Sequence, residues 1–129
     1  MDTEKELQAW EEVKKKSRFS HAFRGLHVFW NSTRNAKIHM FLGILAVILG
    51  IYFCISILEW LAIVFAIGFV FITEILNTAI EIDIDLTSPQ YHPFARDTKD
   101  VAAGAVLLAS FVAFLVGAII FIPKILSVL

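Results

Sequence analysis

The sequence predicts an all-α membrane protein, in which an N-terminal amphipathic surface helix precedes three transmembrane helices. Composition, long uncharged runs and an uneven distribution of basic residues support this fold class. The 129 residues are 58% hydrophobic and have a mean hydropathy of +0.75, whereas a soluble domain is about 45–50% apolar. We therefore divide the chain into a polar N-terminal tail, residues 1–17, and a membrane domain, residues 18–129.

The polar tail and the surface helix come first. We expect the tail to be solvated, although the i,i+4 pairs Glu11/Lys15 and Glu12/Lys16 would support a short helix. Over residues 18–30, apolar side chains recur every three or four residues, which predicts a helix lying on the membrane with its apolar face in the lipid. The recurring residues are Phe19, Ala22, Phe23, Leu26, Phe29 and Trp30.

Three later segments approach the roughly 20 apolar residues that a spanning helix needs. Met40–Leu58 has 19 residues without a charge, and Val101–Ile122 has 22 residues with Ser110 as the only polar side chain. We expect a loop near residues 56–59, and we expect Pro123 to end the third span. The predicted spans are about 38–58, 60–86 and 99–122.

Basic residues lie mostly before the first span. Eight of the eleven Lys and Arg precede it, the first loop has none, and only Lys124 follows the third span. The positive-inside rule therefore predicts a cytoplasmic N-terminus and an outside C-terminus. The basic residues are not interleaved with exposed aromatics as in nucleic-acid-binding proteins, so we expect no nucleic-acid partner.

The stretch "ITEILNTAIEIDID", residues 72–85, places acids inside an apolar segment. At about 100° per residue, five polar side chains share one stripe: Glu74, Asn77, Thr78, Glu81 and Asp85. A charge at mid-bilayer costs roughly 2.5–3.5 kcal/mol on insertion scales, so the stripe should face protein, water or ions. Polar stripes can also join helices, and transporters bind protons or cations at such acids. Two glutamates seven residues apart favour a cation site over simple helix packing.

Lys99 and Asp100 lie at the start of the third span and could bring a cation close to the acids. Lys99 could alternatively be an interfacial anchor. Carboxylates beside a lysine suit divalent cations and phosphate groups. His39 begins the first span, where we expect an interfacial polar anchor, and Cys54 is expected to be apolar filler within that span.

The pattern "EILNTAIE…D…KDVAAGAVL", together with "RNAKIH" and "SPQYHPFARDTKD", resembles the prokaryotic integral-membrane diacylglycerol kinase and undecaprenol kinase family over about residues 18–123. The resemblance implies a multi-pass protein of the bacterial inner membrane. It implies a homotrimer with active sites between subunits at the cytoplasmic face. It also implies that residues 18–129 form a lipid-kinase domain that uses ATP and Mg²⁺ to phosphorylate a lipid alcohol, either diacylglycerol or undecaprenol.

The resemblance also implies roles for matching residues. Glu74 would act as general base, Asn77 would position the base or substrate, and Glu81 would hold Mg²⁺. Asp85 would be a further acid on the same stripe. The remaining matches would contact or border the nucleotide: Lys99, Asp100, His21 and Arg24.

One position departs from the family pattern. The family usually has a second metal-binding glutamate before the first span, whereas this chain has Thr33 in "TRNAKIH". Threonine offers a neutral oxygen, so cation affinity should fall. Glu81 with water and ATP could suffice, or Asp85 could compensate. The alternative is a weakly active or non-catalytic family member that acts as a membrane scaffold.

Overall fold

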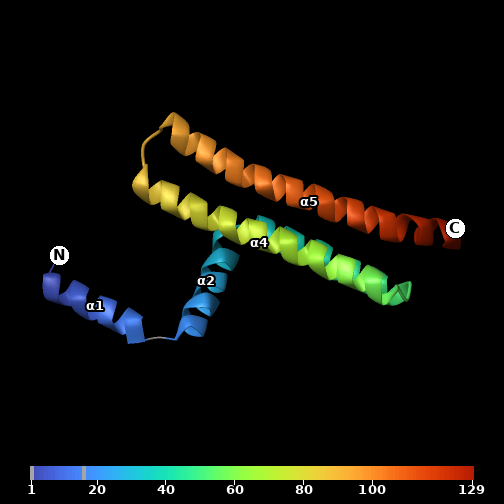
Figure 1. The fold of residues 1–129 in the computed structure, drawn as a ribbon, viewed down its shortest axis with the longest axis horizontal. Helices are drawn as coiled ribbons and strands as arrows, with labels where there is room; N and C mark the ends of the chain where they lie inside the picture. Colours follow the sequence, from blue (N-terminus) through green and yellow to red (C-terminus); the bar gives the residue numbers. More distant parts are fainter. Residues whose placement is uncertain (1, 16) are drawn as a thin grey trace.

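The computed structural model describes residues 2–15 and 17–129, and Figure 1 shows their arrangement. The described residues form helices and connecting turns, which confirms the all-α fold class. The last three helices are long and apolar enough to cross a membrane. The elements are α1 (Thr3–Lys15), α2 (Arg18–Ser32), α3 (Asn35–Tyr52), α4 (Ile57–Thr87) and α5 (Pro93–Val128).

The central unit is the antiparallel pair of α4 and α5 (Figure 1). Helix α3 packs against α4. We call the end at which residues 88–92 connect α4 to α5 the loop end, and the end at which α4 begins the capped end. At the capped end, Ser56 Oγ accepts a hydrogen bond from the Glu59 backbone N–H, and the Glu59 side chain accepts one from the Ser56 N–H. This reciprocal capping box satisfies donors that a helix start leaves free.

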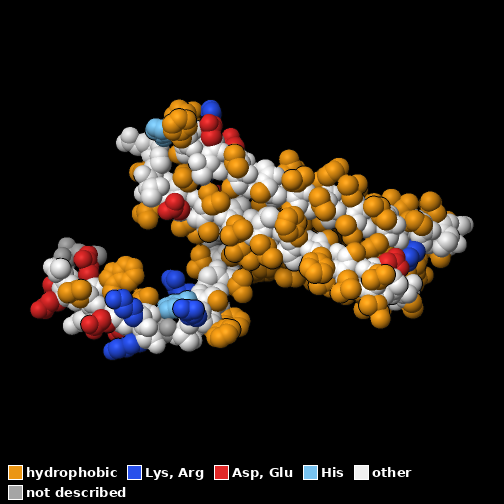
Figure 2. Space-filling model, viewed as in Figure 1, with side chains coloured by type: hydrophobic (Ala, Val, Ile, Leu, Met, Phe, Trp, Pro, Cys, Tyr) orange, Lys and Arg blue, Asp and Glu red, His pale blue; other side chains and the backbone are white. Residues whose placement is uncertain are grey.

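The apolar core lies near the capped end. Ile55, Ile63, Ile120 and Phe121 are buried together, with partly buried residues such as Trp60 packed around them. Elsewhere the helices keep large apolar side chains exposed, and these cover most of the surface of the spans in Figure 2. An apolar surface of this extent fits lipid tails or another protein better than water.

The two N-terminal helices extend away from this bundle (Figure 1). Helix α2 begins where Ser17 Oγ accepts a hydrogen bond from the Ser20 N–H, and its Phe29 is buried. Phe19 and Phe23 remain 79% and 70% exposed, as a helix that inserts one face into lipid requires. The expected solvated tail is largely helical as α1, which has no buried residue.

The structure corrects the ends of the first span. Helix α3 ends at Tyr52 rather than near residue 58, and the turn occupies residues 53–56 rather than 56–59. Cys54 lies in this turn with a φ of 50° and is exposed, so it is not filler within a span. Because the turn residues are themselves uncharged and mostly apolar, hydropathy alone did not separate them from the helix.

The third span is also longer than predicted. Helix α5 begins at Pro93, where the His92 ring nitrogen accepts a hydrogen bond from the Phe94 N–H. The prediction that the helix stops at Pro123 is wrong, because α5 continues to Val128. Proline is tolerated in membrane helices when neighbours stabilise the backbone. Here Lys124 Nζ lies 2.8 Å from Glu59 Oε2 and ties the following turn to α4.

Candidate active site

Glu74 is the most deeply buried charged residue of the acidic stripe. Its side chain is 2% exposed, and its Oε1 lies 3.0 Å from His39 Nε2. One turn later, the buried Thr78 donates its hydroxyl to the Glu74 backbone carbonyl at 2.9 Å. A buried carboxylate needs a hydrogen-bonding partner, and α3 supplies that partner to α4.

His39 is therefore more than the interfacial anchor expected from its position at the start of a span. Its ring is partly buried, with 20% of the side chain exposed, and it bonds to an acid 35 residues away. Hydropathy links residues within one helix and contains no information about contacts between α3 and α4. The "RNAKIH" segment was the available signal, because it belongs to the quoted family pattern.

Asn77 and Glu81 form the second contact on the stripe. Asn77 Nδ2 donates to Glu81 Oε1 at 3.2 Å, while Asn77 Oδ1 is buried and has no hydrogen-bond partner among the described residues. Glu81 is itself exposed. The Glu81 carboxylate and the Asn77 amide oxygen can each accept a further bond. Mg²⁺ prefers oxygen ligands, and it commonly uses only one or two carboxylates plus substrate phosphates.

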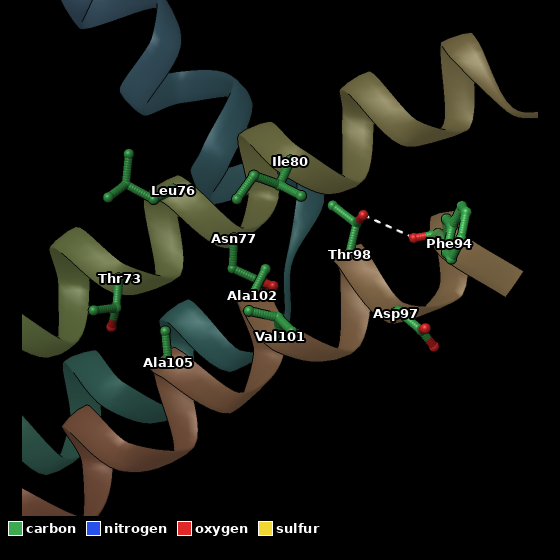
Figure 3. A pocket seen from close by; sticks show the side chains of 10 residues that line it. All are labelled: Thr73, Leu76, Asn77, Ile80, Phe94, Asp97, Thr98, Val101, Ala102 and Ala105. Atoms are coloured by element: carbon green, nitrogen blue, oxygen red, sulfur yellow. Dashed lines mark hydrogen bonds between the residues drawn. The ribbon is translucent and has the colours of Figure 1, made fainter.

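A cavity of about 570 Å³ opens beside Asn77 between α4 and α5. Figure 3 shows Asn77 lying toward Ala102, with Thr98 and Asp97 farther along α5 toward the loop end. The sequence reasoning did not select Asp97 or Thr98, although both lie in the quoted "RDTKD" segment. The small side chain of Ala102 leaves room next to Asn77 between the two helices.

Lys99 and Asp85 connect α5 to α4 near the loop end. Lys99 Nζ lies 2.7 Å from Asp85 Oδ1, with side-chain exposures of 39% and 68%. Lys99 therefore has a carboxylate partner on α4. Asp100 is exposed and forms no ion pair with the described residues.

The structure does not gather all the predicted residues. His21 Nε2 contacts the Val13 carbonyl oxygen of α1 at 2.9 Å, and Arg24 is exposed on α2. Thr33 Oγ1 accepts a hydrogen bond from the Asn35 N–H at 3.1 Å, which directs this oxygen to the start of α3. Within residues 2–15 and 17–129, no three acidic, histidine or cysteine side chains form a metal-binding group.

The side chains of the site become more exposed from Glu74 toward the loop end. The buried Glu74–His39 pair can accept a proton, the Asn77–Glu81 pair offers oxygens to a cation, and Lys99 offers a positive charge for phosphate. Asp83 is exposed on α4 but does not share the stripe of Glu74. All of these groups except His39 lie on α4 and α5 toward the loop end, where charged side chains gather in Figure 2.

Comparison with known proteins identifies the family. The model of the prokaryotic diacylglycerol kinase family matches residues 20–121. An undecaprenol kinase of Bacillus subtilis is 40% identical over 106 residues, covering 82% of this chain and 86% of that protein. A diacylglycerol kinase of Synechocystis is 36% identical over 112 residues, covering 86% of this chain and 64% of that protein. The chain therefore belongs to the prokaryotic diacylglycerol kinase family, a family of lipid kinases.

Proposed function

We propose that the protein is an ATP- and Mg²⁺-dependent kinase that phosphorylates the hydroxyl of a membrane lipid, diacylglycerol or undecaprenol. The observation that carries this proposal is that Glu74, which shares a stripe of α4 with Asn77 and Glu81, is buried and bonded to His39 of α3. A carboxylate held away from water beside a cation-binding oxygen pair suits proton removal next to a phosphate.

The residues divide the reaction between them. The Glu74–His39 pair takes the hydroxyl proton as the lipid oxygen attacks the γ-phosphorus, and the bond to the β-phosphate oxygen breaks to release ADP. Asn77 positions the attacking group. Lys99 exchanges its exposed partner Asp85 for phosphate oxygens. When bound, Mg²⁺ would neutralise phosphate charge, and Glu81 would hold it with Asn77 Oδ1, which has no partner among the described residues.

The remaining nucleotide contacts come from exposed positions. Asp100 and Arg24 are exposed and free to meet a ligand from the aqueous side, and His21 becomes free to do so only if its contact with α1 opens. We place the protein in the bacterial inner membrane with a cytoplasmic N-terminus, because the basic residues precede the first span. ATP is cytoplasmic, which agrees with this orientation.

We infer a homotrimer with sites between subunits. In one subunit, large apolar residues of all three spans remain exposed, and Glu81 is open on α4. Neighbouring copies would cover part of the apolar surface and could supply further ligands to Glu81. Crosslinking in detergent micelles should give a ladder that ends at three subunits.

Phosphate transfer from radiolabelled ATP tests the activity. Mixed micelles should contain diacylglycerol or undecaprenol separately, with Mg²⁺ or with a chelator. We expect label in one lipid, and the 40% identity to an undecaprenol kinase favours undecaprenol. No label in either lipid, with a folded and oligomeric protein, would contradict the proposal.

One observation favours a second candidate, the non-catalytic scaffold. Thr33 replaces a charged metal ligand, and its oxygen is engaged with the Asn35 N–H. A scaffold would assemble and remain in the membrane but would transfer no phosphate. Phosphate transfer by a Thr33→Glu variant separates the two candidates.

A further inference from the structure

Glu74 and His39 differ in whether a ligand in a cavity can reach them. Glu74 lines neither the 570 Å³ cavity beside Asn77 nor a second cavity of about 500 Å³ between α3, α4 and α5. His39 lines the second cavity, which we call the apolar groove. The Glu74 side chain is 2% exposed and the His39 side chain is 20% exposed. A lipid hydroxyl in the groove therefore meets the imidazole, not the carboxylate.

The apolar groove has one polar end. Its lining is hydrocarbon from Leu49 and Phe121 near the capped end to Phe71 on α4, whereas the polar side chains are His39 and Ser110. On α3, His39 is the groove residue farthest from the capped end, and on α5 the same holds for Ser110. A lipid alcohol with its chain in the groove would thus place its hydroxyl at His39.

Hydrogen bonding assigns the tautomer of His39. An ionised carboxylate only accepts hydrogen bonds, so the His39 Nε2 that lies 3.0 Å from Glu74 Oε1 must carry a proton. In the neutral imidazole the other nitrogen, Nδ1, then has a free lone pair. Nδ1 forms no hydrogen bond with the described residues. It is the available proton acceptor of the pair.

We propose that His39 contacts the lipid hydroxyl and takes its proton, while Glu74 acts through His39 as the buried orienting carboxylate. This inference rests on the proposed kinase function. The hydroxyl oxygen forms a bond to the γ-phosphorus as the bond to the β-phosphate oxygen breaks and ADP leaves with the electron pair. The proton moves to Nδ1, Glu74 stabilises the resulting imidazolium, and water later removes the proton.

The surroundings of His39 favour this assignment. On α4, Glu74 is the only acidic side chain within 4.0 Å of the ring among the described residues. On α5, Ser110 is the only polar residue that lines the groove, and on α3 the other lining residues are apolar. The nearest basic residue along α3, Lys37, is exposed. The protonated imidazole would therefore have one counter-charge, Glu74.

The decisive variant is His39→Gln, because the glutamine amide can still donate to Glu74 but cannot take a proton. We expect kcat to fall at least about 100-fold, the size of a lost general base, with a small change in KM. His27→Gln is the matched control, since His27 is exposed on α2 and bonds to Asn31. Size-exclusion chromatography and circular dichroism should show both variants folded and assembled.

Wild-type kcat in folded His39→Gln would overturn the inference while the kinase function stands, because Glu74 would then be the direct base. If the wild-type protein transfers phosphate to neither lipid, the proposed kinase function is wrong, and the inference about His39 is wrong with it.

Discussion

The two ends of the α4–α5 pair each have one lysine–carboxylate contact, and the two contacts have different surroundings. At the capped end, Lys124 lies 2.8 Å from Glu59, and the side chains are 29% and 28% exposed. At the loop end, Lys99 lies 2.7 Å from Asp85, and the exposures are 39% and 68%. The first contact is partly enclosed, whereas the second is open to exchange with a ligand.

The polar groups around each contact sharpen the difference. At the capped end, Glu59 also accepts a hydrogen bond from the Ser56 N–H, and a buried apolar cluster lies nearby. Toward the loop end, Asn77 Oδ1 has no partner among the described residues and Glu81 is exposed. Satisfied polar groups stabilise a fold, whereas a buried polar atom without a partner, such as Asn77 Oδ1, is consistent with a bound water or ion. We therefore assign structure to one end and chemistry to the other.

The largest expected effect comes from Glu74→Gln. Removing the negative charge should lower kcat by about 10²–10⁴-fold, the usual contribution of general acid–base catalysis, with the oligomer intact. Glu59→Gln removes a carboxylate from the other end of the same helix and should keep wild-type kcat. Initial rates with the labelled lipid measure both. Equal losses of kcat in Glu74→Gln and Glu59→Gln would contradict the assignment of catalysis to the loop end alone.

Gly50→Ala should affect stability and not chemistry. A Cβ at this position would lie 2.6 Å from a ring carbon of Trp60 near the capped end. Overpacking of this kind costs about 1–3 kcal/mol of unfolding free energy. Gly68→Ala is the control, because no atom lies within 4 Å of its added Cβ. Thermal unfolding in detergent measures both variants, and an unchanged melting temperature in Gly50→Ala would contradict the packing argument.

Replacing each of the two lysines by glutamine, in separate variants, tests the comparison of the two ends directly. Lys99→Gln should raise the KM for ATP about tenfold, equivalent to about 1.4 kcal/mol of lost phosphate binding. Lys124→Gln should leave KM unchanged and lower stability by less than about 1 kcal/mol, because a partly exposed ion pair contributes little. Kinetics at varied ATP and thermal melts separate these results. A raised KM in Lys124→Gln would show that the capped end also affects the nucleotide.

Thr33→Glu should give the smallest change. A carboxylate at this position would add a charged oxygen near the start of α3, and we expect the Mg²⁺ concentration for half-maximal activity to fall a few-fold. Titration of Mg²⁺ at saturating ATP measures this shift, with Ser32→Glu as the neighbouring control. A large gain in rate would reveal a metal-site defect in the natural chain. Inactivity in both forms would favour the scaffold.

Much of the fold was predictable because a bilayer imposes strict rules on sequence. Length and apolarity of Val101–Ile122 indicated a span, and three candidate spans are confirmed. The helix ends were less predictable. The turn around Cys54 consists of residues as apolar as the helix before it, and Pro123 is accommodated inside α5. Local sequence does not reveal whether a helix will end at a given residue, because contacts with neighbouring helices can stabilise the helix beyond it.

The candidate site was predictable in part. Periodicity alone placed Glu74, Asn77 and Glu81 on one stripe, and the charge pattern directed attention to Lys99. The contact between Asn77 and Glu81 follows from their i,i+4 spacing. The partners of Glu74 and Lys99 were not available from periodicity, because a hydrogen bond between helices depends on how those helices pack. Asp97 and Thr98 were missed for the same reason, since only the approach of α4 to α5 places them beside Asn77 in one cavity.

The sequence by itself determined that the chain is helical, that three segments can cross a membrane and that acids share one stripe of the second. These properties follow from hydropathy and from the 3.6-residue helical period. Only the tertiary structure decided that Glu74 is enclosed and bonded to His39, while Glu81 on the same stripe stays exposed. Burial and pairing depend on the neighbouring helix, and residues 35 positions apart meet only after α3 has packed against α4.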